Sequence, residues 1–303
     1  MFRLHLPVPG RRFVIGVPYA WLLLFFFLPF LILLYISFVD MGNDILPFKP
    51  IWDTQTGLLK LKYENYTSIF YNVEGGLFRT LYIEAYARSI WYALCNAVLC
   101  LVLGYPFAYF IARSSARIRP ALLMMVMLPF WTSFLLRVYA WKGILADQGV
   151  LNQILLSSGL ISEPIQMLYT NVSMLVGLVY VYLPFMVLPL YANLVKLDGR
   201  LLEAAHDLGA SPFKAFWLVT VPLSKAGIVA GFMLVFIPSM GEFVIPSLLG
   251  GPENIMIGRV VWDEMFTSNN WPRATALAVV MIAFIVVPLA LYYRYAAKAS
   301  DRR

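Results

Sequence analysis

Residues Leu197 to Pro222 read LDGRLLEAAHDLGASPFKAFWLVTVP, a charged stretch between two long apolar runs. The apolar residues that recur here at helical spacing are Leu201, Leu202, Ala205 and Leu208. The polar residues on the other side are Glu203, His206 and Asp207. Gly209 supplies a helix stop, and Ser211-Pro212 restarts the chain as N-cap and first helical residue. We therefore predict a short amphipathic helix, a glycine turn and a second short helix, lying across a membrane surface as a docking surface.

The composition excludes a water-soluble domain. Of the 303 residues, 61% are hydrophobic and 13% are charged, where a soluble domain has roughly 25% charged residues. The mean hydropathy is +0.76. One soluble core cannot hide this much apolar surface, so we predict an all-α polytopic membrane protein. The net charge of +7 is dispersed among loops and does not indicate nucleic acid binding. Cys95 and Cys100 lie in one apolar run and are expected to be packing residues, not a disulfide or metal site.

Six apolar segments are each long enough to cross a hydrocarbon core of about 30 Å. They are Val14–Val39, Glu84–Ala112, Ala121–Trp141, Val172–Val195, Leu223–Leu249 and Ala274–Tyr295. The first follows two arginines, as a signal peptide does, but it is longer than a signal core and lacks a cleavage site, so we expect a retained helix. The predicted organisation is a cytoplasmic N-terminus (1–13), a first transmembrane helix (14–39), a periplasmic loop (40–83), a transmembrane domain (84–295) and a cytoplasmic tail (296–303).

The distribution of Lys and Arg predicts the orientation of these spans. Successive spans cross the membrane in opposite directions. The basic residues that then lie on the same side as the N-terminus are Arg3, Arg11, Arg12, Arg113, Arg117, Arg119, Lys196, Arg200, Lys214, Lys225, Arg294, Lys298, Arg302 and Arg303. The acids that accompany them on that side are Asp198, Glu203, Asp207 and Asp301. Because cytoplasmic loops carry the excess of basic residues, both termini and residues 197–222 are expected in the cytoplasm.

Prolines interrupt nearly every span, and each removes one backbone hydrogen bond, which lipid tolerates only beside other helices or a watery cavity. Bundle packing explains any single proline. The pairs Pro184/Pro189 and Pro238/Pro246 are the better candidates for bends that line a path.

Glu242 is the anomalous residue of the fifth span. A charge at the centre of a span costs about 2.5–3.5 kcal/mol, so Glu242 is expected to face the bundle interior or water. Its carboxylate suits a cationic substrate; the alternatives are an internal pair with Arg137 or Lys142, or a place near the outer interface. Aromatic rings attract an ammonium group, and those near this region are Trp131, Tyr139, Trp141, Tyr180 and Tyr182. We predict a substrate-binding set of Glu242, Trp131, Tyr139 and Tyr180, and neither a catalytic nor a metal site.

Residues 197–222 resemble the EAA loop of ABC-importer permeases. Glu203-Ala204-Ala205, three residues, Gly209, nine residues and Val219-Thr-Val-Pro222 match its pattern, with valines where the family prefers Ile and Leu. In that family the loop is a coupling helix that sits in a cleft of a cytoplasmic ATPase. The residues to which the resemblance gives this coupling role are Glu203, Ala204, Ala205, Gly209, Pro212 and Pro222.

Further blocks resemble the polyamine-importer permeases, closest to the putrescine permeases of the PotH type and next to the spermidine permeases of the PotB type. The blocks are Leu103–Ala108, Leu128–Phe134, Arg137–Trp141, Leu183–Pro189, Gly241–Pro246 and Gly250–Gly258. The resemblance implies the six-helix type I (MetI-like) permease fold in a bacterial inner membrane. It also implies a second homologous permease, two copies of an ATPase that binds ATP and Mg, a periplasmic polyamine-binding protein, and no cofactor in this chain.

Two rival functions remain open on the sequence. One is an ABC permease for spermidine or another small cationic solute. The other is a secondary transporter that needs no ATPase, which predicts inverted repeats that we do not find. An enzyme is not supported, because no catalytic pair of residues and no phosphate-binding loop is present.

Overall fold

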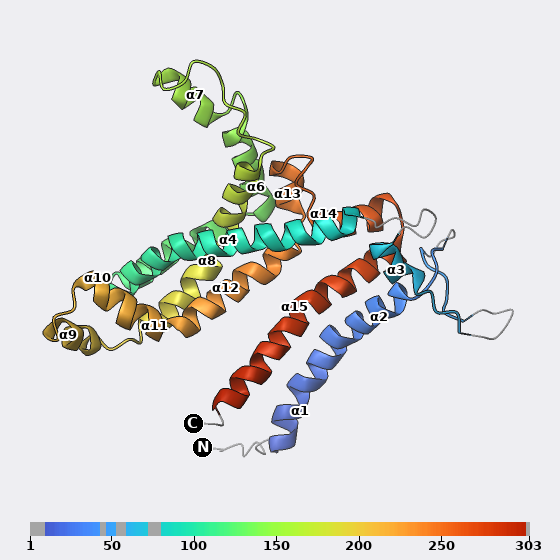
Figure 1. The fold of residues 1–303 in the computed structure, drawn as a ribbon, viewed down its shortest axis with the longest axis horizontal. Coiled ribbons are helices and arrows are strands. Elements are labelled where there is room, and N and C mark those ends of the chain that lie inside the picture. The colour runs from blue at the N-terminus through green and yellow to red at the C-terminus, as the bar shows by residue number, and fades with distance from the viewer. Residues whose placement is uncertain (1–9, 43–46, 53–58, 72–79, 301–303) are drawn as a thin grey trace, which may run out of the picture. The chain divides into compact units, whose positions relative to one another are not determined.

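The structure is a computed structural model that describes residues 10–42, 47–52, 59–71 and 80–300 (Figure 1). The predicted cytoplasmic ends at 1–9 and 301–303, and parts of the predicted periplasmic loop, lie outside these ranges. The chain divides into two compact units, unit 1 (Met1–Thr80 with Val261–Arg303) and unit 2 (Leu81–Val260). Regular structure in the described ranges is helical apart from two isolated bridges, Met41 with Phe48 and Trp52 with Leu59, which confirms the all-α prediction.

Unit 1 is a helical layer in which α15 packs against α2 and α3 (Figure 1). Its elements are α1 (Arg11–Leu22), the π-helical turn η1 (Leu23–Phe27), α2 (Leu28–Ser37), α3 (Glu64–Phe70), the π-helical turn η4 (Asp263–Thr267) and α15 (Trp271–Ser300). The side-chain amide of Asn65 donates to the carbonyls of Ser37 at 3.0 Å and Val39 at 2.9 Å. These bonds satisfy carbonyls left free at the end of α2 and fix the short helix α3 there.

Unit 2 holds most of the chain and all of the predicted site residues. Its elements are α4 (Thr80–Arg113), α5 (Arg119–Met127), the 3₁₀ turn η2 (Leu128–Trp131), α6 (Phe134–Leu145), α7 (Val150–Ser157), α8 (Asn171–Leu194), α9 (Arg200–Asp207), α10 (Pro212–Ala215), the π-helical turn η3 (Phe216–Thr220), α11 (Val221–Leu223), α12 (Lys225–Met240), α13 (Val244–Leu249) and α14 (Ile257–Trp262), which crosses the unit boundary. Helices α8 and α12 form the centre of the unit, and α13 packs against both α6 and α8.

Every predicted span corresponds to helix, but not every span is one helix. The helices long and apolar enough to cross a membrane are Phe13–Ser37, Leu81–Arg113 and Asn171–Leu194. Two further candidates are pairs bent by 87° (Arg119–Trp131 with Phe134–Ser157) and 67° (Pro212–Leu223 with Lys225–Met240), and Trp271–Val287 is a shorter apolar helix. The structure interrupts the third predicted span between η2 and α6, and the fifth between α12 and α13, where the pair Pro238/Pro246 predicts a bend.

Prolines widen two helices in the same way. The π-helical turns η1 and η3 each end two residues before a proline, Pro29 and Pro222. A proline cannot donate to the carbonyl four residues earlier, and its ring clashes with that carbonyl. A wider turn upstream moves the carbonyl away, which is why the helix continues past the ring. In contrast, α8 runs as one helix through Pro184 and Pro189, so this pair does not interrupt the helix.

A seam of buried polar side chains attaches α4 to the rest of unit 2. The seam residues are Ser89, Tyr92, Asn96 and Tyr105, and their respective hydrogen-bond partners include the Ile257 N–H, Asn254, Ser239 and Ser224, at 2.7 to 2.9 Å. Lipid offers no alternative partner to these groups, so each must be satisfied inside the bundle. Such interhelical bonds contribute about 0.6 kcal/mol each on average, and together they fix the rotation of α4 about its axis.

Helices α8 and α12 approach closely because α12 carries Gly227 and Gly231, four residues apart. A Cβ atom added at Gly231 would lie 2.7 Å from the Met186 Sδ, and one at Gly227 would lie 2.8 Å from the Asn193 Cβ. This is the small-residue spacing by which membrane helices bring their backbones into contact.

Candidate functional site

The break between α12 and α13 positions Glu242. Helix α12 ends at Met240, and the Gly241 N–H already bonds back to the Pro238 carbonyl at 3.2 Å. The backbone of Gly258 lies against this break, where an added Cβ would collide with the Gly241 carbonyl oxygen. The backbone that packs against the break comes from the Gly250–Gly258 block, and Gly258 is the residue whose missing side chain allows the contact.

Both oxygens of the Glu242 carboxylate have partners within unit 2. The Tyr182 hydroxyl donates to Oε2 at 2.7 Å, and the Val244 N–H donates to Oε1 at 3.0 Å. The second bond satisfies a free donor in the first turn of α13. The Ile245 N–H also donates to Oε1, at 3.5 Å, and all three donors are neutral. Among the described residues Glu242 forms no ion pair, so the predicted alternatives of pairing with Arg137 or Lys142 are wrong for this structure.

A row of aromatic rings leads away from this carboxylate. The ring centroids of Tyr182 and Phe185 are 6.1 Å apart, and Phe185 meets Phe130 edge-on at 5.2 Å. The Arg137 guanidinium lies over the Phe130 ring, 5.2 Å from its centroid. The row therefore joins a carboxylate in the break between α12 and α13 to a guanidinium on α6, through rings of α8 and η2.

Sequence reasoning missed Phe130 and Phe185. Both end a Leu-Pro-Phe triplet, Leu128–Phe130 and Leu183–Phe185, but the same triplet also occurs at Leu28–Phe30 and Leu46–Phe48, so it does not single out these two residues. Tyr182 was named among the aromatic residues but was left out of the predicted binding set.

The other predicted aromatic residues do not gather around Glu242. Trp131 is 77% exposed and Tyr139 is 55% exposed. Tyr180 is half-buried and packs edge-on against Trp141, with the two ring centroids 5.5 Å apart. No hydrogen bond within the described ranges joins any of these three to the carboxylate. Their role in substrate binding stays a prediction.

Arg137 is a partly desolvated cation at the far end of this row. Its Nε and Nη1 atoms are buried and have no hydrogen-bond partner in the described part of the chain. Its interaction with the Phe130 ring compensates the charge only partly, because a cation over a ring gains about 0.5–2 kcal/mol. The site therefore holds one carboxylate and one guanidinium, separated by rings.

Residues 197–222, which we call the coupling segment, adopt the predicted helix, glycine turn and helix. Gly209 has a φ of +82°, the left-handed conformation that favours glycine, and it follows α9 directly. The Ser211 hydroxyl accepts the Lys214 N–H at 3.4 Å, so Ser211 is the N-cap of α10 and Pro212 is its first residue. These local features confirm the predicted helix, turn and helix. Each of them depends on only one or two neighbouring residues.

The coupling segment exposes both its polar and its apolar side chains. Glu203 and Ala204 are exposed and Ala205 is half-buried. The most exposed large apolar residues of the segment are Leu208 (89%), Phe213 (73%) and Leu218 (72%). The His206 ring nitrogen Nδ1 lies 2.9 Å from the Ala210 carbonyl oxygen, so this histidine helps to close the glycine turn. A surface that mixes apolar side chains with a polar rim is typical of a docking site for another protein.

No group of three or more His, Cys, Asp or Glu residues that could hold a metal ion occurs in the described ranges. Cys95 and Cys100 are free cysteines, half-buried and buried respectively.

Comparisons with known proteins agree on one family. Residues 101–303 match the family model described as binding-protein-dependent transport system inner membrane component. The chain is 37% identical over 285 residues to the spermidine/putrescine transport system permease protein PotB of Haemophilus influenzae, covering 94% of this chain and 93% of that one. It is 39% identical over 275 residues to the same permease of Escherichia coli K12, covering 91% and 94%. These relatives are of the second of the two subfamilies that the sequence blocks resemble.

A more distant relative and a solved structure extend the likeness. The chain is 32% identical to the inner membrane ABC transporter permease protein YdcU of Escherichia coli K12, covering 73% of this chain and 74% of that one. A chain in the crystal structure of a bacterial alginate ABC transporter shares the fold, with a TM-score of 0.60 at 18% identity, covering 91% of this chain and 90% of that one. The relatives are transport components of the inner membrane, so this chain is a multi-pass inner-membrane transport subunit and not an enzyme. The chain belongs to the family of inner-membrane components of binding-protein-dependent transport systems.

Proposed function

We propose that this chain forms half of the translocation path of an ATP-driven importer for linear polyamines, with putrescine and spermidine as the substrates to test. The observation that carries the substrate class is the Glu242 carboxylate, whose hydrogen-bond donors are a phenol and two backbone amides. Neutral donors orient the carboxylate and leave its negative charge uncompensated. The descriptions of the relatives as spermidine/putrescine permeases support the same class.

The path itself is proposed to pass the row of rings. A polyamine is a flexible chain with ammonium groups separated by methylenes. Its ammonium groups would be attracted by Glu242 and by ring faces, and its methylenes would pack against Phe185, which is 37% exposed. Arg137 would repel an ammonium group at the far end of the row, so a substrate would be held near Glu242.

The coupling segment is proposed to bind a separate cytoplasmic ATPase, which supplies the energy. A second homologous permease would complete the path, and a periplasmic binding protein would deliver the polyamine. The exposed Glu203 and the apolar side chains beside it support this assignment. The rival function, a secondary transporter, would show polyamine uptake in vesicles that contain this chain but no ATPase.

Glu242→Gln tests the substrate site. The amide oxygen of glutamine can accept from the Val244 N–H, and its NH2 group can donate to the Tyr182 hydroxyl oxygen, so the variant removes the charge and keeps both contacts. We expect putrescine and spermidine uptake by the assembled importer to fall at least about tenfold. A tenfold fall corresponds to a loss of about 1.4 kcal/mol of interaction free energy with the substrate. The matched control is Glu163→Gln, an exposed acid on the loop that follows α7. Uptake at the parent level in an assembled Glu242→Gln complex would remove Glu242 from the site.

A further inference from the structure

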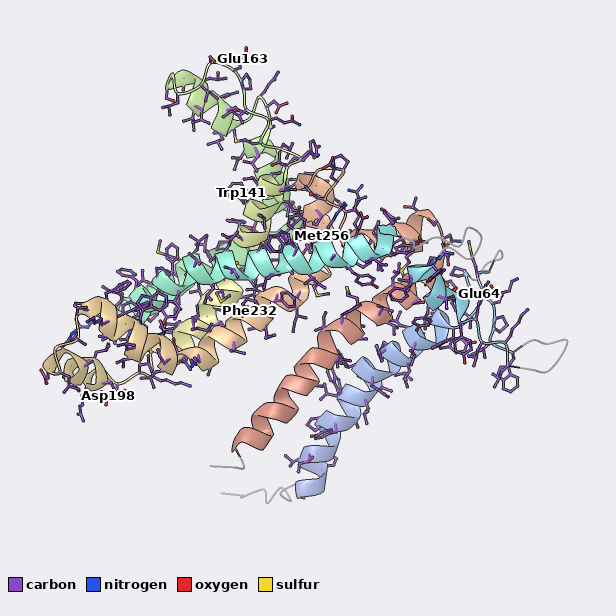
Figure 2. All side chains as sticks on the ribbon, viewed as in Figure 1. Glu64, Trp141, Glu163, Asp198, Phe232 and Met256 are labelled. Carbon is purple, nitrogen blue, oxygen red and sulfur yellow. The ribbon has the colours of Figure 1, made fainter. Side chains whose placement is uncertain are left out.

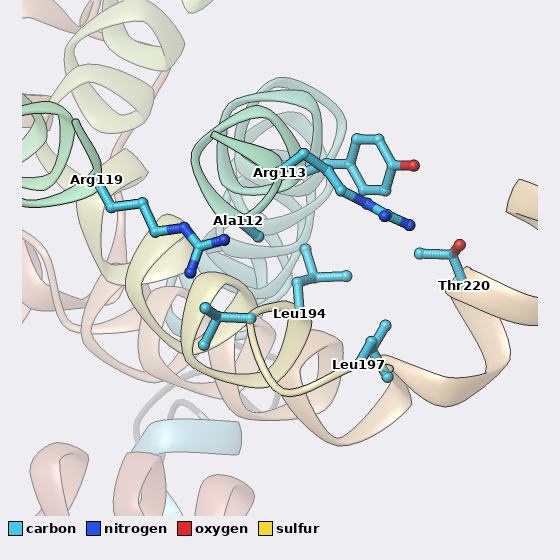
Figure 3. A pocket seen from close by; sticks show the side chains of 8 residues that line it. Ala112, Arg113, Arg119, Leu194, Leu197 and Thr220 are labelled. Carbon is cyan, nitrogen blue, oxygen red and sulfur yellow. The ribbon is translucent and has the colours of Figure 1, made fainter. Parts of the chain in front are cut away.

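A small cavity lies in unit 2 where α4 and α8 end, beside the coupling segment (Figure 3). Its volume is about 190 Å³. The residues that line it are Tyr109, Ala112, Arg113, Arg119, Leu194, Val195, Leu197 and Thr220. Two of these are arginines and none is acidic.

Each arginine is positioned by one interaction that leaves other N–H groups free. The Arg113 guanidinium lies over the Tyr109 ring, 5.4 Å from its centroid. The Arg119 Nε–H donates to the Ser114 carbonyl at 2.8 Å. Figure 3 shows the two guanidinium groups on either side of Ala112, with Thr220 across from Arg113. A guanidinium has five N–H donors, so both side chains retain donors for a further ligand.

Helix dipoles account for only one of these charges. Arg113 ends α4, where a cation is favourable. Arg119 begins α5, where the positive end of the helix dipole makes a cation unfavourable. An anion bound in the cavity would offset that cost.

Thr220 is the independent indication of a ligand. Its side chain is 2% exposed, and its hydroxyl has no hydrogen-bond partner among the described residues. A helical threonine commonly bonds to the carbonyl four residues earlier, which here is that of Phe216. In the π-helical turn η3 that carbonyl accepts the Val221 N–H instead. Buried hydroxyls are normally satisfied, so an unpaired one that lines a cavity with two guanidinium groups calls for an acceptor in that cavity.

We propose that this cavity binds a phosphate group, with Arg113, Arg119 and Thr220 as its donors. Guanidinium groups match the geometry of phosphate oxygens, and the hydroxyl supplies a neutral donor. The cavity has no place for a polyamine, because it holds two positive charges. The phosphate belongs either to the headgroup of an anionic lipid or to free phosphate. In either case its occupancy ties the end of α4 to η3, at the base of the coupling segment.

The test uses the full-length protein, purified with the subunits that accompany it, in nanodiscs of phosphatidylcholine. In one arm inorganic phosphate is titrated at constant ionic strength against chloride, and the unfolding midpoint Tm is measured. In the other arm phosphatidylglycerol replaces part of the lipid. A rise in Tm with inorganic phosphate identifies free phosphate as the ligand, and a rise with phosphatidylglycerol alone identifies the lipid headgroup.

The variants separate this site from a general response to anions. Thr220→Val keeps the shape of the side chain and removes the hydroxyl, while Thr220→Ser keeps the hydroxyl. We expect Thr220→Val, Arg113→Gln and Arg119→Gln each to raise about tenfold the ligand concentration that gives half of the maximal rise in Tm. Thr220→Ser should keep the parent value. Arg117→Gln, an exposed arginine of the same loop outside the cavity, is the control and should respond as the parent does. No response in either arm, or an equal response in Thr220→Val, would overturn the proposal.

Discussion

At Glu242 the hydrogen bonds fix the position of the carboxylate, whereas its negative charge is the part proposed to attract a substrate. The bond to Val244 serves α13, whereas the bond to Tyr182 joins α8 to the break between α12 and α13. The tyrosine hydroxyl therefore fixes where the negative charge lies without reducing it. Tyr182 is a positioning residue for the proposed substrate site.

Tyr182→Phe removes this hydroxyl and leaves the ring. A neutral hydrogen bond contributes about 0.5–1.5 kcal/mol, so we expect the KM for polyamine uptake to rise several-fold with little change in the maximal rate. Uptake kinetics at equal complex levels measure this. Tyr191→Phe is the control, because Tyr191 lies on the same helix and its hydroxyl bonds to no described residue. Equal effects of the two substitutions would contradict the positioning role.

The sequence identifies Glu242 but not its partner. A lone carboxylate in an apolar span stands out because burying it is costly. Tyr180 and Tyr182 are two residues apart, and therefore about 200° apart around a helix. Helix α8 is apolar on every side, so no periodicity indicates its rotation. The choice of Tyr180 over Tyr182 could not be improved without the packing of α8 against α13.

Among the elements, the coupling segment is the one whose local structure the sequence predicts best. Gly209, Ser211 and Pro212 each act through their own backbone or through a neighbour three residues away. The break of the third span near Pro129 was not predicted, because prolines occur in nearly every span and only some interrupt the helix. Whether a proline breaks, widens or leaves a helix depends on neighbouring helices, as α8 illustrates.

Glu203→Lys tests the coupling segment as a docking element. Reversal of this exposed charge on α9 should release the proposed ATPase or abolish stimulation of ATP hydrolysis, while the chain itself folds normally. Copurification and ATPase activity measure the two effects. Asp147→Lys, an exposed acid on the loop after α6, is the matched control. An intact complex with full transport would count against docking at this helix.

Gly227→Ala tests the contact between α8 and α12. The new Cβ would lie 2.8 Å from the Asn193 Cβ and 3.0 Å from the Pro189 carbonyl oxygen, so the helices must separate. Overpacking of this kind costs about 1–3 kcal/mol, and the Tm of the purified protein should fall. Gly143→Ala, which places its Cβ in open space on α6, should leave the Tm unchanged or raise it. If both variants had the same Tm, the close approach would not contribute to stability.

On the scale of the whole molecule, the fold class follows from composition, but the two units do not. Apolar segments are similar throughout the chain, and nothing in the sequence marks Leu81 or Val260 as a boundary. Within unit 2, Glu163 and Asp198 lie at opposite ends (Figure 2). This arrangement fits the charge distribution, which predicts the first outside and the second inside.

Single cysteines test that orientation. Glu163→Cys should react with a membrane-impermeant maleimide in cells with a permeabilised outer membrane, and Asp198→Cys only after lysis. The unchanged chain supplies the background, which should be low because Cys100 is buried and Cys95 half-buried. Labelling of Asp198→Cys in intact cells would reverse the predicted topology and remove the coupling role.

The polar seam of α4 also sets a demand on biosynthesis. Asn96 pairs with Ser239, and 143 positions separate the two along the chain. Ribosomes add about 5–20 residues per second, so Ser239 is synthesised about 7–30 s after Asn96. Throughout that interval an unpaired amide in hydrocarbon costs several kcal/mol, which favours holding α4 at the insertion machinery until α12 emerges. The order of synthesis therefore matters for this fold: α4 is made early, but its buried polar side chains find their partners only after α12 has been made.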